Sequence, residues 1–93
     1  MALIRDLSTW YDTPAEFPAE AAFKQAFQDY RVAWPAGFVV LIDKPLLLTY
    51  TVIKEWVDAH KTGRATVHSH PSIAIVFFEV YEDALAFYMT YAK

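Results

Sequence analysis

Two histidines separated by one serine are the residues best placed to do chemistry in this chain. In the run His68-Ser69-His70 the imidazoles are two positions apart, and residues at that spacing on a β-strand project from the same face. Neutral imidazoles held side by side can bind zinc or another transition metal, and His60 is the candidate third ligand. The pair is therefore a candidate metal site. The interpretation that the sequence favours is two surface histidines on the solvated side of an outer strand.

The same strand carries a basic residue on the histidine face. Arg64 and Thr66 alternate in register with His68 and His70, which gives a small, polar and partly basic patch. Such a patch could receive a phosphate or a small anionic ligand through charge-assisted hydrogen bonds. The patch is therefore a candidate ligand-binding face, and the interpretation that the sequence favours is again an ordinary solvated surface.

Catalysis has weaker support than binding in this sequence. Acid–base work needs two titratable groups with separated pKa values in one cleft. Asp43 and Asp58 are the candidate carboxylates for such a pair with His68 or His70. Asp58 or Glu79 could also serve as a further metal ligand. The spacing of these residues in the sequence selects none of them. The serines lack the glycine-rich surroundings of a nucleophile elbow, and the chain has no cysteine. We therefore expect a protein without catalytic residues, and keep a small enzyme as the alternative.

Aromatic residues offer a second route to function. They make up 17% of the chain, more than a small core needs, and exposed rings are typical of partner or subunit surfaces. Two groups stand out, one in a proline-containing N-terminal segment and one near or on the last predicted helix: Trp10, Tyr11, Phe17, Tyr81, Tyr88 and Tyr91. Large rings in such places either pin a segment to the core or anchor a partner. They predict a protein partner or a homo-oligomer, with core packing as the alternative.

Charge and composition exclude other classes of partner. Eight Lys and Arg stand against eleven Asp and Glu, a net charge of -3, with no basic cluster, so nucleic-acid binding is not expected. The longest uncharged apolar runs, 32–42 and 72–78, are too short to span a bilayer. The N-terminus lacks a secretory signal, and a chain without cysteine fits a reducing compartment. We expect a single cytoplasmic domain over residues 1–93 that holds no resident cofactor unless the histidines bind a metal.

Hydrophobic periodicity and turn residues divide the chain into short elements. The segment 46–51 is ambiguous between strand and helix, and Thr51 is a plausible N-cap. The predicted elements are a strand at 2–7, a turn near 14, helices at 18–31, 51–61 and 82–92, and strands at 38–42, 64–70 and 73–80. This order predicts an α+β fold, a two-layer sandwich with an antiparallel-rich sheet and helices packed on one face.

Two of the predicted helices have informative apolar patterns. The last helix is apolar nearly all round, which indicates burial from more than one side and a subunit interface. The helix at 18–31 has a single apolar stripe that continues beyond its end: Phe23, Ala26, Phe27, Tyr30 and Trp34.

The C-terminal segment resembles a known kind of protein. Its sequence is Ile73-Ala-Ile-Val-Phe-Phe-Glu-Val-Tyr-Glu-Asp-Ala-Leu-Ala-Phe-Tyr-Met-Thr-Tyr91, a buried strand, then Glu-Asp-Ala, then an aromatic-rich helix. It is similar to the ends of small ferredoxin-like proteins, including short phage-encoded ones, over about a fifth of the chain. The resemblance implies an accessory or inhibitory binding protein and carries over no functional residue.

These observations combine into one functional expectation. We expect a small, non-catalytic intracellular binding protein that acts through an aromatic-rich face, and the resemblance implies a phage-type modulator or inhibitor of a host protein. The alternative is a ligand- or metal-binding module that uses Arg64, His68 and His70.

Overall fold

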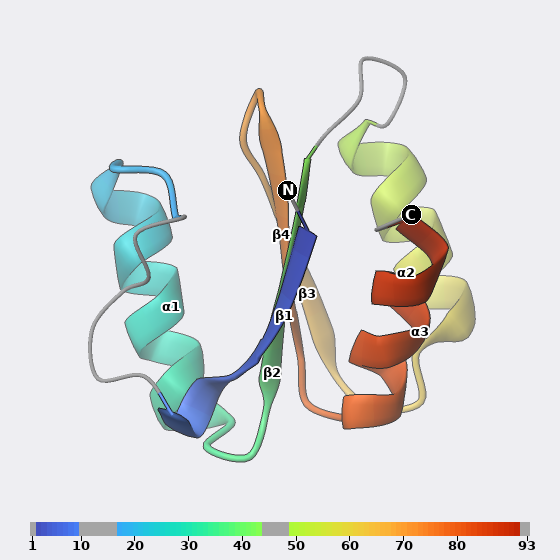
Figure 1. Cartoon of the computed structure of the whole chain (residues 1–93), viewed down its shortest axis with the longest axis horizontal. Helices are drawn as coiled ribbons and strands as arrows, with labels where there is room; N and C mark the ends of the chain where they lie inside the picture. The colour runs from blue at the N-terminus through green and yellow to red at the C-terminus, as the bar shows by residue number, and fades with distance from the viewer. Residues whose placement is uncertain (1, 10–16, 44–48, 92–93) are drawn as a thin grey trace.

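A computed structural model of the chain describes residues 2–9, 17–43 and 49–91. The described segments form four strands, three α-helices and one short 3-10 turn, which alternate along the chain (Figure 1). In chain order they are β1 (Ala2–Asp6), η1 (Leu7–Thr9), α1 (Ala21–Ala33), β2 (Phe38–Asp43), α2 (Tyr50–His60), β3 (Ala65–Ser69), β4 (Ile73–Phe78) and α3 (Tyr81–Tyr91).

The four strands form one antiparallel sheet in the order β1-β2-β4-β3. β2 and β4 occupy the centre, and every residue of β4 is buried. β1 and β3 are the outer strands. A short turn joins β3 to β4, and His70 and Ile73 exchange backbone hydrogen bonds at its base. The hairpin predicted from the sequence is therefore confirmed.

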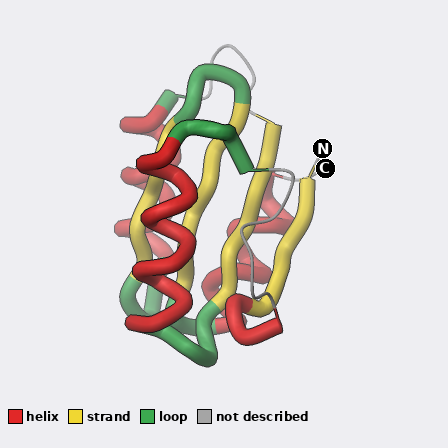
Figure 2. Tube along the Cα trace, turned by 90° about the vertical axis from the view of Figure 1, so that its left-hand side faces the viewer, coloured by secondary structure: helices red, strands yellow, loops and turns green. Residues whose placement is uncertain are grey.

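Helices cover both faces of this sheet. Figure 1 shows α1 on one side of the strands and α2 and α3 on the other, and Figure 2 shows the same layers after a 90° turn. The core is accordingly split in two. Val39, Leu41, Ile75 and Phe77 lie in the α1-side core. The α2/α3-side core takes the alternate residues of the same two strands: Val40, Ile42, Ala74, Val76 and Phe78.

The predicted α+β class, the antiparallel sheet and the packing of helices on it are confirmed. The expectation of a two-layer sandwich with all helices on one face is corrected to three layers. The physical reason lies in β2 and β4. Successive side chains of a strand point to opposite faces, so a central strand that is apolar at every position must be covered on both.

The predicted element boundaries hold within a few residues. The helix expected at 18–31 is α1, from Ala21 to Ala33, and its predicted stripe faces the sheet, with Ala26, Phe27 and Trp34 buried. The helix expected at 51–61 is α2. It begins one residue earlier, because Thr49 and not Thr51 is its N-cap, and the Thr49 hydroxyl accepts a hydrogen bond from Val52 N–H at 3.3 Å.

Two sequence expectations fall partly or wholly outside the described residues. The turn near 14 lies outside them, as does the first half of the ambiguous segment 46–51, residues 46–48. Within that segment, Tyr50 and Thr51 are helical. In the described part of the chain, no helix has the length and apolar character needed to cross a membrane.

Candidate functional site

The polar face predicted for β3 forms as expected, but it lies beneath α1. Thr66 and His68 pair across the sheet with Phe77 and Ile75 of the α1-side core. Arg64 and His70 continue the same alternation at the two ends of the strand. We call Arg64, Thr66, His68 and His70 the β3 polar row. Helix α1 packs against His68 and His70 through Tyr30 and Phe23, whereas the Arg64 side chain remains 70% exposed. The interpretation as a solvated surface is therefore corrected for the two histidines, which are half-buried.

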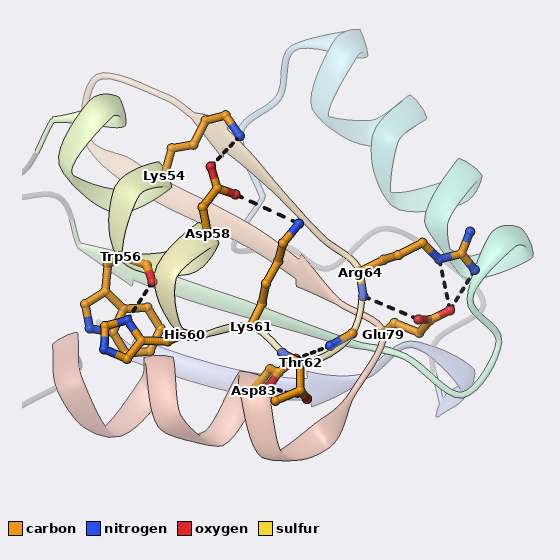
Figure 3. Close-up of polar contacts among 10 residues, drawn as sticks. Lys54, Trp56, Asp58, His60, Lys61, Thr62, Arg64, Glu79 and Asp83 are labelled. Carbon is orange, nitrogen blue, oxygen red and sulfur yellow. Dashed lines mark hydrogen bonds and ion pairs between the residues drawn. The ribbon is translucent and has the colours of Figure 1, made fainter.

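Arg64, at one end of the row, is held by a carboxylate and an aromatic ring. Its Nη2 and Nε donate to Glu79 Oε2 at 2.6 and 3.1 Å (Figure 3), and its guanidinium lies 5.6 Å from the centre of the Trp34 ring. This hydrogen bonding lowers the pKa of Glu79 and raises that of Arg64. The fork-shaped pairing occupies donors that an anionic ligand would need.

His68, in the middle of the row, lies between two aromatic rings. It meets Phe77 edge-on at 5.5 Å between centroids and Tyr30 of α1 at 6.0 Å. Its Nε2 is shielded from solvent and is the one buried side-chain nitrogen or oxygen of the described residues without a hydrogen-bond partner. Burial lowers the pKa of His68, because desolvation disfavours the charged imidazolium.

His70, at the other end, is engaged by its neighbours in the turn and by α1. Its Nδ1 accepts a hydrogen bond from the Ser72 backbone N–H at 3.2 Å and lies 3.0 Å from the Ser72 hydroxyl. Its Nε2 lies 3.4 Å from Glu20 Oε1, at the start of α1, and its ring packs edge-on against Phe23 at 5.7 Å. Both nitrogens therefore face groups of this chain.

The residues that would complete a metal site lie elsewhere. His60 belongs to α2, on the other face of the sheet, where its ring stacks on Trp56 at 4.2 Å and its Nδ1 donates to the Trp56 carbonyl (Figure 3). Asp58, also on α2, forms ion pairs with Lys54 and Lys61. Among the described residues, no group of three His, Cys, Asp or Glu is arranged to hold a metal ion.

The predicted aromatic anchors separate into buried and surface residues. Phe17 is buried and packs edge-on against Phe27 at 5.3 Å, so it serves the core. Trp10 and Tyr11 lie outside the described residues. Tyr91 is half-buried against Trp56 and Phe87, and desolvation raises its pKa.

The remaining two anchors help to form an apolar stripe along α3. Tyr81 is 46% exposed and Met89 is 57% exposed, while Leu85 and Tyr88 are half-buried. Spacings of three, four and eight residues place these side chains on one flank of a helix. We call Tyr81, Leu85, Tyr88 and Met89 the α3 stripe.

The α3 stripe lies on the flank of α3 away from α2. On the α2 flank, Phe87 and Tyr91 contact Trp56 at 5.6 and 5.8 Å. On the other flank, Tyr81 contacts Phe38 of β2 at 5.0 Å. Tyr88 packs against the edge of the α2/α3-side core. The stripe therefore borders the sheet at Tyr81 and Tyr88, and its exposed part, at Met89 and Tyr81, lies outside the contact with α2.

Asp83 is an important residue whose main contact the sequence did not reveal. The sequence interpretation assigned it only a favourable place at a helix start, but it is buried and accepts three hydrogen bonds from the loop after α2 (Figure 3). The donors are the Thr62 N–H at 2.8 Å, the Gly63 N–H at 2.9 Å and the Thr62 hydroxyl at 3.0 Å. These contacts span about twenty positions of sequence, and no local pattern signals them.

Comparison with known proteins adds no relative. No protein-family model, curated protein or solved structure matches the chain.

Proposed function

We propose that this protein is a non-catalytic binding protein that associates with a second copy of itself through the α3 stripe. The observation that carries the proposal is that apolar side chains remain exposed on the flank of α3 that α2 does not cover. A helix that is apolar all round is normally covered on more than one side. Here Phe87 and Ala84 fill the core, yet Tyr81 and Met89 remain exposed.

A second copy suits this surface because the stripe can pair with itself. Its ends are eight residues apart, or about 12 Å along a helix. Two copies related by a twofold axis would set Tyr81 of each against Met89 of the other, the self-complementary geometry of isologous dimers. Met is well suited to such contacts because its flexible side chain adapts to the opposing surface.

Electrostatics favours the same surface. Within Tyr81–Tyr91 the charged residues are Glu82 and Asp83, and Asp83 is buried by its contacts with the loop after α2. Glu82 is exposed and lies three residues before Leu85 and seven before Met89, so it borders the stripe. Pairing along α3 must leave Glu82 at the solvated rim, because burying an unpaired charge is costly. The β3 polar row supports a ligand-binding role less well, since Arg64 and His70 are already engaged within the chain.

Sedimentation velocity over a wide range of concentrations tests the proposal. The wild-type chain should shift from monomer to dimer as concentration rises. Met89→Glu should weaken this association by about tenfold or more, equivalent to about 1.4 kcal/mol or more, because it places a carboxylate in the apolar contact. Tyr81→Ser should act in the same direction.

Val32→Glu is the matched control for this experiment. Val32 is 81% exposed on α1, on the other side of the sheet, so the variant makes the same chemical change away from the stripe. It should dimerise like the wild type. A wild-type chain that stays monomeric throughout, or a Met89→Glu variant that dimerises unchanged, would contradict the proposal. If the wild-type chain is monomeric, the result would instead favour an inhibitor that binds another protein through the α3 stripe.

A further inference from the structure

The contact between α1 and β3 contains the titratable ring of His68. Among the described residues, no carboxylate lies there to compensate a positive charge on that ring. Along this contact, Phe23 and Tyr30 of α1 meet His70 and His68 of the β3 polar row, and Trp34, the C-cap residue of α1, meets Arg64. The outer two pairs are reinforced by carboxylates, Glu20 beside His70 and Glu79 beside Arg64. Among the described residues, His68 in the central pair contacts the rings of Tyr30 and Phe77 and has no carboxylate contact, and its Nε2 has no hydrogen-bond partner.

The neutral ring tolerates this environment better than the charged one. A neutral ring leaves one uncharged nitrogen without a hydrogen-bond partner, which costs less than leaving a full charge uncompensated. A protonated ring would carry a full charge in the same surroundings, and desolvating an uncompensated charge is expensive. On the same face of β3, the neighbours of His68 are Arg64, which is positively charged, and His70, which is another histidine.

The groups on the other packed elements do not offset that charge. Facing His68 on β4 are Ile75 and Phe77, which are apolar. On α1 the facing group is Tyr30. It is flanked in sequence by Arg31 and by Asp29, whose carboxylate already accepts a hydrogen bond from Gln25 at 2.8 Å.

We infer that the contact between α1 and β3 is sensitive to acid, and that protonation of His68 releases α1 from the edge of the sheet. Release separates the rings of α1 from Phe77 and uncovers part of the α1-side core. The α2/α3-side core does not contain His68 and stays closed. The fold thus contains a local pH-dependent opening on the face opposite the α3 stripe.

The direction of the effect follows from proton linkage. A histidine whose pKa is lower in the closed state than in the open state binds its proton preferentially in the open state. Opening should become more favourable as pH falls through the usual histidine value of about 6.5, by up to about tenfold per pH unit, until the closed state also protonates. Above that value the helix stays docked.

Amide hydrogen exchange followed by NMR, with rates converted to protection factors, measures the opening directly. In the wild type, protection of α1 amides such as those of Phe27 and Tyr30 should fall between pH 7.5 and about 5.5, by up to about tenfold per pH unit, while protection of α3 amides changes much less. In His68→Phe, which keeps a ring but removes the titration, α1 protection should be nearly independent of pH. His70→Gln is the matched control on the same face of the same strand, and it should keep the wild-type fall.

A second measurement on the wild type keeps the inference testable if His68→Phe does not fold. The ring protons of His68 report the closed state, so they should titrate below the usual histidine value of about 6.5, and the fall in α1 protection should level off near that midpoint. The inference is overturned if His68 titrates at or above that value, if α1 and α3 lose protection in parallel, or if His68→Phe retains the fall.

Discussion

At the scale of single residues, two carboxylates do the most to position the candidate surfaces. Glu79 anchors Arg64 at one end of the β3 polar row. Asp83 ties the start of α3 to the loop that follows α2, through three hydrogen bonds. The first contact is exposed to solvent and the second is largely buried, so they should respond differently to substitution.

Replacing Asp83 should destabilise the fold. Asp83→Asn keeps the shape of the side chain but turns an amide group toward donors that need an acceptor. Leaving buried donors without partners costs about 1–3 kcal/mol, and more when a charged group is lost. We expect the free energy of unfolding, measured by urea denaturation, to fall by about 2–3 kcal/mol. The neighbouring exposed residue supplies the control: Glu82→Gln should stay within about 0.5 kcal/mol of the wild type, and an equal effect of both substitutions would argue against the Asp83 contacts.

The Arg64–Glu79 pair should be visible in a titration. Arg64 lowers the pKa of Glu79, chiefly by hydrogen bonding to its carboxylate. A carboxylate with a lowered pKa stabilises the fold above its unfolded-state value, and this contribution disappears as pH falls through the lower folded-state value. In carboxyl-carbon NMR, Arg64→Met should move the Glu79 midpoint upward, toward the ordinary glutamate value. Lys54→Gln, which removes a different ion pair, should leave that midpoint unchanged; an unchanged midpoint in Arg64→Met would rule out the pairing in solution.

The alternation of β3 shows how far sequence reasoning reaches at this scale. The period of two correctly placed His68 and His70 on one face and Ala65 and Val67 on the other. The alternation did not show that α1 packs on the face that carries the histidines, because this depends on how the chain places α1 across the sheet. For the same reason the unpaired Nε2 of His68 was not foreseen.

At the scale of elements, helix ends were the least certain part of the prediction. The sequence favoured Thr51 as the N-cap of the second helix, whereas Thr49 has extended backbone angles and accepts the capping hydrogen bond. Both threonines are followed by residues of good helical pattern, so the sequence alone does not separate them. Residues 44–48, which precede this helix, lie outside the described part of the chain.

Alanine substitution separates the two threonines. Thr49→Ala should lower the free energy of unfolding by about 1 kcal/mol, because it removes the acceptor for Val52 N–H. Thr51→Ala should be neutral or slightly stabilising, since alanine has the higher helix propensity. Thermal or urea unfolding monitored by circular dichroism would show the difference, and the reverse order would restore Thr51 as the cap.

At the scale of the whole molecule, the three-layer arrangement decides what is available at the surface. Coverage of both faces of the sheet buries all of β4 and the four middle residues of β2. The polar row on β3 is drawn under α1, and the outward flank of α3 remains as an apolar surface. The number and order of elements followed from hydrophobic periodicity. The fully apolar central strands already indicated two covered faces, but the assignment of each helix to a face needed the fold itself.

The measurement that tests the central claim most directly is native mass spectrometry of the chain purified without added metal, chelator or histidine tag. We predict a dimer whose mass equals two bare chains and whose population rises with concentration, because the α3 stripe pairs with its copy. Single chains at every concentration would contradict self-association through α3. A metal ion or small molecule carried by each chain would contradict the account more broadly and direct attention back to the β3 polar row.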